Sequence, residues 1–316
     1  MLSLVPVLLA AATIVWIFVF LLPGDPARLM AGGQSVDPEI LNSIRHEWGL
    51  DRPAPLQYLC YLEKLIRFDL GTSYVQRRPV VSIVAGSFPP TFILAVTALL
   101  LATGAGLVLG SLAALQRGRL LDSFVLILAL VGTSMPVFWL GMILMLLFAS
   151  RLGWLPVLGY GMEGAFIPFT SVRLPEWDHL VLPALTLSLV SLGAIARITR
   201  ASLIEAGTSE FLQTARAKGA SRARVFVRHT LQNALIPVVT VIGMDFAGLL
   251  GGAVATEYVF AWPGLGKAIV RAIGLRDLPV VEGGVLFLTA VFVLVSLAVD
   301  LAYLYLDPRI HYAPSG

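Results

Sequence analysis

Long stretches without a charged residue alternate with short charged segments along this chain. A helix needs roughly 20 apolar residues to cross the hydrocarbon core of a bilayer. The pattern therefore predicts an all-α integral membrane protein with six transmembrane helices. The predicted spans are residues 1–22, 88–115, 123–150, 180–196, 235–259 and 283–306.

The first apolar stretch has two interpretations, a membrane span or a cleaved signal peptide. Residues 2–22 carry no charge. A signal peptide has a basic start and an apolar core of only about 7–15 residues. Because this stretch is longer and no basic residue precedes it, we interpret it as an uncleaved span.

Composition supports the same class of protein. The 316 residues are 58% hydrophobic and 13% charged, whereas a soluble domain is about 25% charged. The net charge of +3 does not indicate nucleic-acid binding, because the basic residues lie mainly on loops. The single cysteine, Cys60, excludes an intrachain disulfide and a metal site built from several thiolates.

Charged and turn-forming residues predict the connections between the spans. Residues 23–86 are expected to form an extracytoplasmic cap with short helices, one beginning at Pro38 and ending before Gly49. Pro136 is expected to bend the third span. The remaining connections are extracytoplasmic loops at 151–178 and 260–282, and a cytoplasmic loop at 197–234.

The distribution of basic residues predicts the orientation. The loops after spans two and four, together with the C-terminal tail, hold ten Lys or Arg against four Asp or Glu. The opposite loops hold twelve basic and twelve acidic residues over roughly twice the length. Since basic loops stay on the cytoplasmic side, both termini are predicted to be cytoplasmic.

The most distinctive segment is a charged island at Glu210–Pro237 within this apolar chain. Ser209 can cap a short helix that starts at Glu210, and Gly219 can end that helix. Such a helix would present a docking knob to a soluble partner. An ordinary basic loop that obeys the positive-inside rule is the alternative.

The order of residues in the island resembles a known motif. Ala215-Arg-Ala-Lys-Gly219, followed by His229, Asn233 and Pro237, resembles the EAA loop of ABC-importer permeases, in the form typical of the dipeptide/oligopeptide subfamily. Further similarity lies at residues 22–27, 249–257, 262–266 and 306–310. The resemblance implies the type I ABC importer permease fold, with one permease domain over about residues 70–306.

The resemblance also implies a mechanism and partners. The EAA loop of this family forms the coupling helix that fits a groove on the ATPase subunit. The matching residues here are Glu210, Thr214, Ala215, Arg216, Ala217, Lys218 and Gly219. The implied partners are a second homologous permease, one or two P-loop ATPases that hold ATP and Mg, and an extracytoplasmic substrate-binding protein in a prokaryotic inner membrane.

The implied substrates are di- or oligopeptides, with glutathione or a nickel chelate as alternatives. This chain is expected to carry no cofactor or metal of its own. Candidate residues of the substrate pathway lie on the fifth span: Asp245, Gly248, Gly252 and Glu257. A carboxylate at the depth of Asp245 must face water or a partner, so it either lines the pathway or joins two helices. Glu257 is expected at an external gate or in the interfacial zone.

Catalytic motifs do not accompany this pattern. His46-Glu47 lacks the second histidine of a zinc protease, and Gly264-x-Gly266-Lys267 lacks the first glycine and the Ser/Thr of a phosphate loop. The chain is therefore expected neither to bind nor to hydrolyse ATP. The competing function is a secondary transporter with Asp245 as its proton- or ion-coupling site.

Overall fold

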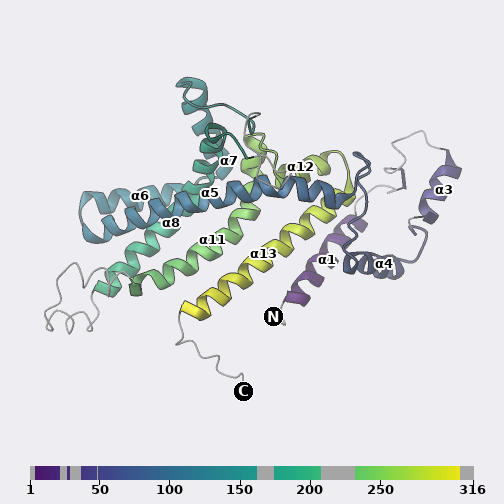
Figure 1. Ribbon diagram of the computed structural model, residues 1–316, viewed down its shortest axis with the longest axis horizontal. Coiled ribbons are helices and arrows are strands. Elements are labelled where there is room, and N and C mark those ends of the chain that lie inside the picture. The colour runs from purple at the N-terminus through teal and green to yellow at the C-terminus, as the bar shows by residue number, and fades with distance from the viewer. Residues whose placement is uncertain are drawn as a thin grey trace, which may run out of the picture. The chain divides into compact units, whose positions relative to one another are not determined.

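The computed structural model describes residues 4–21, 27–28, 37–47, 49–161, 174–207 and 232–306. These residues are mostly helical (Figure 1), and within them the one β feature is an isolated bridge between Thr72 and Pro79. The helices are α1 Leu4–Leu21, α3 Pro38–Glu47, α4 Ala54–Ile66, α5 Val80–Leu115, α6 Leu120–Ser134, α7 Val137–Leu144, η1 Met145–Arg151, α8 Trp177–Gly207, α11 Gln232–Val259, α12 Leu265–Gly274 and α13 Leu278–Leu306.

Several of these helices are long and apolar enough to cross a membrane. α5, α8 and most of α13 each pass this test alone. Two bent pairs, α6 with α7 and η1, and the two parts of α11, raise the number to five if each pair forms one span. α1 is apolar but shorter, at 18 residues. The described residues thus contain three to five candidate spans, whereas the hydropathy pattern predicts six for the whole chain.

Two helices extend well beyond the apolar stretches that predict them. α5 begins at Val80 rather than at residue 88, so Pro89 and Pro90 lie inside the helix and not at its start. α8 covers Trp177–Gly207 rather than residues 180–196. Hydropathy locates only the lipid-crossing part of a helix, whereas these extensions are stabilised by packing against other helices.

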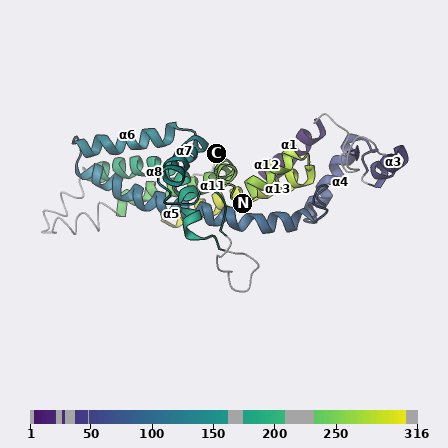
Figure 2. The ribbon, with the colours of Figure 1, turned by 90° about the horizontal axis from the view of Figure 1, so that it is seen from above.

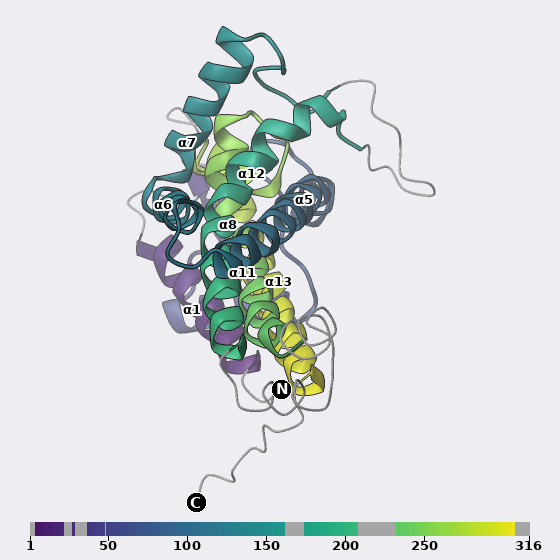
Figure 3. The same cartoon turned by 90° about the vertical axis from the view of Figure 1, so that its left-hand side faces the viewer.

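The predicted bend at Pro136 is a complete break. Met135 and Pro136 have extended backbones with ψ of 137° and 130°, and the axes on either side differ by 110°. Proline disfavours a helical conformation in the residue before it, which explains why α6 ends at Ser134. Figure 3 shows α6 end-on and α7 leading away from it. α7 continues into η1, a π-helix.

Contacts divide the chain into two compact units. One comprises residues 1–91 and 263–291, and the other comprises residues 92–262 and 292–316. Each unit therefore combines segments that are distant in the sequence.

The first unit has a core formed by the start of α5, α12 and the start of α13. Its buried residues are Val80, Ile83, Val84, Leu265, Ile269, Ala272 and Val280. Two polar connections support this core. Thr91 Oγ1 accepts the backbone N–H of Leu265, at 2.8 Å, and Asp277 accepts hydrogen bonds from the Ser73 hydroxyl and the Tyr74 N–H. α4 meets α1 through a 2.6 Å hydrogen bond between the Tyr58 and Thr13 hydroxyls.

The second unit is organised around α8. Buried residues of α5, α6 and α8 form one cluster, Ala113, Val125 and Ala196, and Figure 2 shows α6 running alongside α8. Glycines allow the close approach of these helices. An ideal Cβ at Gly110 of α5 would lie 2.5 Å from the Ala196 carbonyl oxygen, and one at Gly132 of α6 would lie 2.6 Å from the Leu189 carbonyl oxygen. Backbone-to-backbone contact of this kind is typical of helices packed in membranes.

Helix α11 ends in a backbone turn that the sequence does not signal with glycine. Ala261 has a φ of +52°, and the Trp262 N–H donates to the Glu257 carbonyl oxygen at 2.8 Å. This is the hydrogen bond of a Schellman motif, in which the left-handed residue is usually glycine. The fully buried side chains of Phe260 and Trp262 hold the alanine in this conformation.

Candidate functional site

The residues predicted to couple the chain to an ATPase lie outside the described part of the structure. These are Glu210, Thr214, Ala215, Arg216, Ala217, Lys218 and Gly219, all within residues 208–231. The structure describes the two helices that flank this segment, since α8 ends at Gly207 and α11 begins at Gln232. The site is therefore defined by the helix ends that hold the segment.

The two flanking helix ends are packed together. Leu203 and Ala206, in the last two turns of α8, form a buried cluster with Ala234, in the first turn of α11. Ala114 of α5 packs against the same cluster. Three of these four side chains are alanines, which allow the backbones to approach closely. The end of α8 and the start of α11 thus lie next to each other and next to the end of α5.

A buried ion pair involves Arg200, which lies about one turn before Leu203 in α8. Arg200 Nε donates to Asp122 Oδ1 at 2.5 Å, and Arg200 Nη2 donates to Asp122 Oδ2 at 2.8 Å. The side chain of Asp122 is 6% exposed and that of Arg200 is 22% exposed. In the sequence pattern, Asp122 and Arg200 appear only among the loop charges that predict the orientation. Asp122 stands at the start of a long apolar stretch, and this position is the only hint in the sequence that it needs a charged partner. That partner, Arg200, is 78 residues away in the chain.

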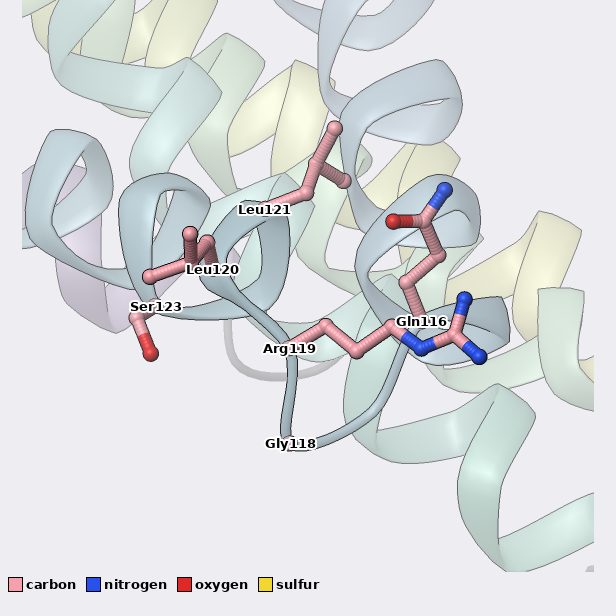
Figure 4. A pocket seen from close by; sticks show the side chains of 6 residues that line it. All are labelled: Gln116, Gly118, Arg119, Leu120, Leu121 and Ser123. Atoms are coloured by element: carbon pink, nitrogen blue, oxygen red, sulfur yellow. The ribbon is translucent and has the colours of Figure 1, made fainter.

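Asp122 also shapes the turn between α5 and α6. Its Oδ2 accepts the Gly118 N–H at 2.9 Å, and Gly118 has a φ of +78°, which suits glycine. A pocket of about 620 Å³ lies at this turn, lined by Gln116, Gly118, Arg119, Leu120, Leu121 and Ser123. Figure 4 shows the side chains of Gln116 and Arg119 extending to the same side of the turn.

Asp245 is half-buried on α11 and lies near Ser191 of α8, whose hydroxyl forms a hydrogen bond with the carboxylate. The other carboxylate oxygen, Oδ2, is buried and has no hydrogen-bond partner among the described residues. This arrangement joins two helices and also leaves one acceptor available.

Gly248 and Glu257, the other candidates on α11 whose surroundings are described, differ in exposure. Gly248 is exposed, with nothing within 4 Å of an ideal Cβ, and Gly252 lies in the helix without a described environment. Glu257 is fully buried, with 0% exposure. It lies twelve residues beyond Asp245, which is about 18 Å along a helix. Phe260 and Trp262, which follow at the end of α11, are also buried, and the sequence pattern does not reveal this burial.

Glu176, Asp178 and His179 are the described residues that come closest to a metal-ligand cluster, with ligand atoms within 4.8 Å of one another. They lie at the start of α8, where carboxylates are favourable because of the helix dipole. Asp178 Oδ1 accepts the His179 N–H at 2.9 Å, and Glu176 Oε2 lies 3.8 Å from His179 Nε2. These contacts indicate that the three residues stabilise the start of α8.

The phosphate-loop-like residues Gly264, Gly266 and Lys267 form the start of α12. Both glycines are buried, and the Leu265 N–H already donates to Thr91 Oγ1. A phosphate loop presents free backbone N–H groups to its ligand. The structure assigns this helix start to packing within the first unit.

The geometry defines a class of protein: an integral membrane protein whose distinguishing segment is a charged insertion between two packed helices. Comparison with known proteins gives the family. Residues 1–95 match the N-terminal part of binding-protein-dependent transport system membrane components, and residues 106–312 match the binding-protein-dependent transport system inner membrane component. The chain belongs to this family.

Curated relatives cover nearly the whole chain. It is 41% identical to the glutathione transport system permease protein GsiC of Salmonella typhimurium, over 312 residues that make up 99% of this chain and 97% of the relative. The GsiC protein of Escherichia coli K12 is 39% identical over the same shares. A solved amino acid ABC transporter has a similar fold, with a TM-score of 0.52 and 14% sequence identity, over 73% of this chain and 95% of that chain.

Family membership confirms the resemblance that the island motif predicted. The chain is an inner-membrane ABC importer permease of the peptide/glutathione family. It is a non-catalytic transport subunit, and permeases of this family carry no cofactor. A binding-protein-dependent system also implies an ATPase and a substrate-binding protein as partners.

Proposed function

We propose that this chain is one of two homologous permeases in an ATP-driven importer of short peptides, with glutathione as the first substrate to test. The supporting observation is the 41% identity to glutathione permeases over 99% of the chain. This relation favours glutathione over the di- and oligopeptides that the sequence motifs indicate. A nickel chelate is the less supported alternative.

The proposed topology has six spans, with α1 as the first and both termini in the cytoplasm. α1 has 18 apolar residues, which is within the range that spans a bilayer. The excess of basic residues in 116–122, 197–234 and the tail supports a cytoplasmic location for these segments. Residues 23–86, 151–178 and 260–282 then face the binding protein.

The proposed mechanism is alternating access driven by one or two P-loop ATPase subunits. Residues 210–219 form the coupling helix, which the closing ATPases push when they bind ATP. The packed ends of α8 and α11 support this role, because a force applied between them reaches both helices. The pathway between the two permeases then opens to the cytoplasm. Asp245 and Gly248 are the candidate lining residues.

The coupling role has its own test. Glu210→Lys reverses a charge, and Gly219→Trp places a large side chain where the short helix is expected to end. Both variants should assemble and hydrolyse ATP but transport little substrate. If both variants transported as much substrate per ATP hydrolysed as the wild type, the coupling role of residues 210–219 would be contradicted.

The function is tested by reconstitution. The chain is purified with its co-isolated subunits, placed in liposomes with the binding protein, and assayed for uptake of labelled glutathione, a dipeptide, an oligopeptide and a nickel chelate. We expect uptake of glutathione that requires ATP and the binding protein. A partner ATPase with its phosphate-loop lysine replaced is the control.

Two results would contradict the proposal. Preferential uptake of the dipeptide or oligopeptide would replace the substrate while leaving the importer class intact. Uptake by the chain alone, driven by a proton gradient, would instead make it a secondary transporter with Asp245 as the coupling group.

A further inference from the structure

In the second unit, the carboxylate of Asp122 links α6, α8 and the turn that follows α5. Asp122, in the first turn of α6, accepts two hydrogen bonds from Arg200 of α8 and one from the Gly118 N–H in the turn after α5. Both carboxylate oxygens are used. The two-point Arg–carboxylate geometry fixes orientation as well as distance.

The ion pair lies near the end of α8, the helix that precedes residues 208–231. Arg200 precedes the end of α8 at Gly207 by about two helical turns. Between them, Leu203 and Ala206 pack against Ala234 of α11 and Ala114 of α5. A displacement of residues 208–231 would therefore reach this part of α8 as well as the start of α11.

Close helix contacts beyond the ion pair leave little room for independent sliding. An ideal Cβ at Gly110 of α5 would lie 2.7 Å from Thr199 Cβ, and one at Gly193 of α8 would lie 2.6 Å from the Ala129 carbonyl oxygen of α6. Packed interfaces of this density transmit strain rather than absorb it. α5, α6 and α8 thus form one block along these contacts.

The ion pair completes this block at its end. It adds a directional connection to α8 beside the apolar cluster of Ala113, Val125 and Ala196, whose contacts have no directional preference. Removing one partner of a buried pair also leaves the other charge uncompensated, so the intact pair resists opening.

We infer that Asp122 and Arg200 are positioning residues that fasten the α5–α6 turn to the C-terminal part of α8. Movement of residues 208–231 then shifts α5 and α6 together with α8. The inference rests on the proposed function, because it assumes that residues 208–231 receive force from an ATPase. Neither residue is assigned contact with substrate or ATP.

The test separates coupling from stability. Asp122→Asn removes the charge but keeps an oxygen that can accept the Gly118 N–H, whereas Arg200→Lys keeps the charge but removes the two-point geometry. The exchange Asp122→Arg with Arg200→Asp restores opposite charges. Arg197→Gln is the matched control, because Arg197 is an exposed arginine on the same helix.

Each variant is purified as the full complex and reconstituted. Assembly yield, ATP hydrolysis and substrate uptake are measured, and uptake per ATP hydrolysed is the decisive quantity. We expect Asp122→Asn and Arg200→Lys to lower this ratio by about tenfold, since the buried charge pair is lost or misaligned. The exchange should recover part of the ratio, and Arg197→Gln should leave it unchanged.

A purely structural role would lower assembly, hydrolysis and uptake together and leave the ratio at the wild-type value, and that result would overturn the inference. If Asp122→Asn fails to assemble, Arg200→Lys alone decides. A wild-type complex without ATP-driven uptake would instead overturn the proposed function. If the wild-type complex shows ATP-driven uptake and the variants have the same uptake per ATP hydrolysed, only the role of the ion pair would be overturned.

Discussion

Gly193 on α8 lies directly against the backbone of Ala129 on α6. A Cβ built on Gly193 would lie 2.6 Å from the Ala129 carbonyl oxygen and 3.0 Å from its Cα. Gly132 makes the reciprocal contact with the Leu189 carbonyl oxygen at 2.6 Å. Two glycines, one on each helix, therefore set the distance between α6 and α8.

We predict that Gly193→Ala destabilises the protein, because the added methyl group meets backbone atoms that cannot turn aside. Overpacking of this kind typically costs about 1–3 kcal/mol. Gly104→Ala is the control, since nothing lies within 4 Å of its ideal Cβ, and alanine there should be neutral or stabilising by up to about 1 kcal/mol. Thermal unfolding in detergent measures both. Equal unfolding midpoints for the two variants would contradict the contact.

Thr91 provides a second prediction, in the first unit. Its hydroxyl oxygen accepts the Leu265 N–H at the start of α12, and both residues are buried. Thr91→Val keeps the shape but leaves that N–H unpaired, which should cost about 1–3 kcal/mol. Thr91→Ser keeps the acceptor and should recover most of the loss. If valine and serine gave the same unfolding midpoint, the hydrogen bond would not contribute to stability.

Tyr160 gives a prediction about pH. Burial raises the pKa of its phenol to about 12, and its ring packs 4.6 Å from that of Trp262. Because the folded pKa is above the usual value of about 10, the contribution of Tyr160 to stability is complete below pH 10 and is lost as the pH rises toward 12.

Absorbance titration of tyrosinate should therefore show a late step in the folded protein. The amplitude of that late step should fall by one tyrosine in Tyr160→Phe, because burial also raises the pKa of Tyr61 and Tyr74. In denaturant the Tyr160 step should move to a pH of about 10. The unfolding midpoint of the wild type should fall more steeply between pH 10 and 12 than that of Tyr160→Phe. An unchanged late step in the phenylalanine variant would assign it to another tyrosine.

Asp245 gives a prediction about transport. Asp245→Asn removes the charge while keeping an oxygen that can accept the Ser191 hydroxyl, so its effect on unfolding should be small. If the carboxylate faces the pathway, the KM for substrates with a free amino group should rise. Ser191→Ala, which removes the helix–helix hydrogen bond and keeps the charge, is the control. Unchanged kinetics for several peptides in Asp245→Asn would leave Asp245 a purely structural residue.

The class of this protein follows from the sequence alone. A chain with 58% hydrophobic residues in long uncharged stretches has to place them in lipid, and every backbone group in lipid must be satisfied within a helix. The motif around Ala215–Gly219 indicated the family, which the comparisons confirm over almost the whole chain. Both conclusions depend on local composition and residue order.

Only the tertiary structure decided which charges meet and where helices begin and end. The partner of Asp122 is 78 residues away, and Glu257 is fully buried near the end of α11. Pro136 indicated a bend, but the 110° change of direction depends on what α6 and α7 pack against. These features result from contacts between distant segments, and one-dimensional patterns of hydropathy and charge do not record such contacts.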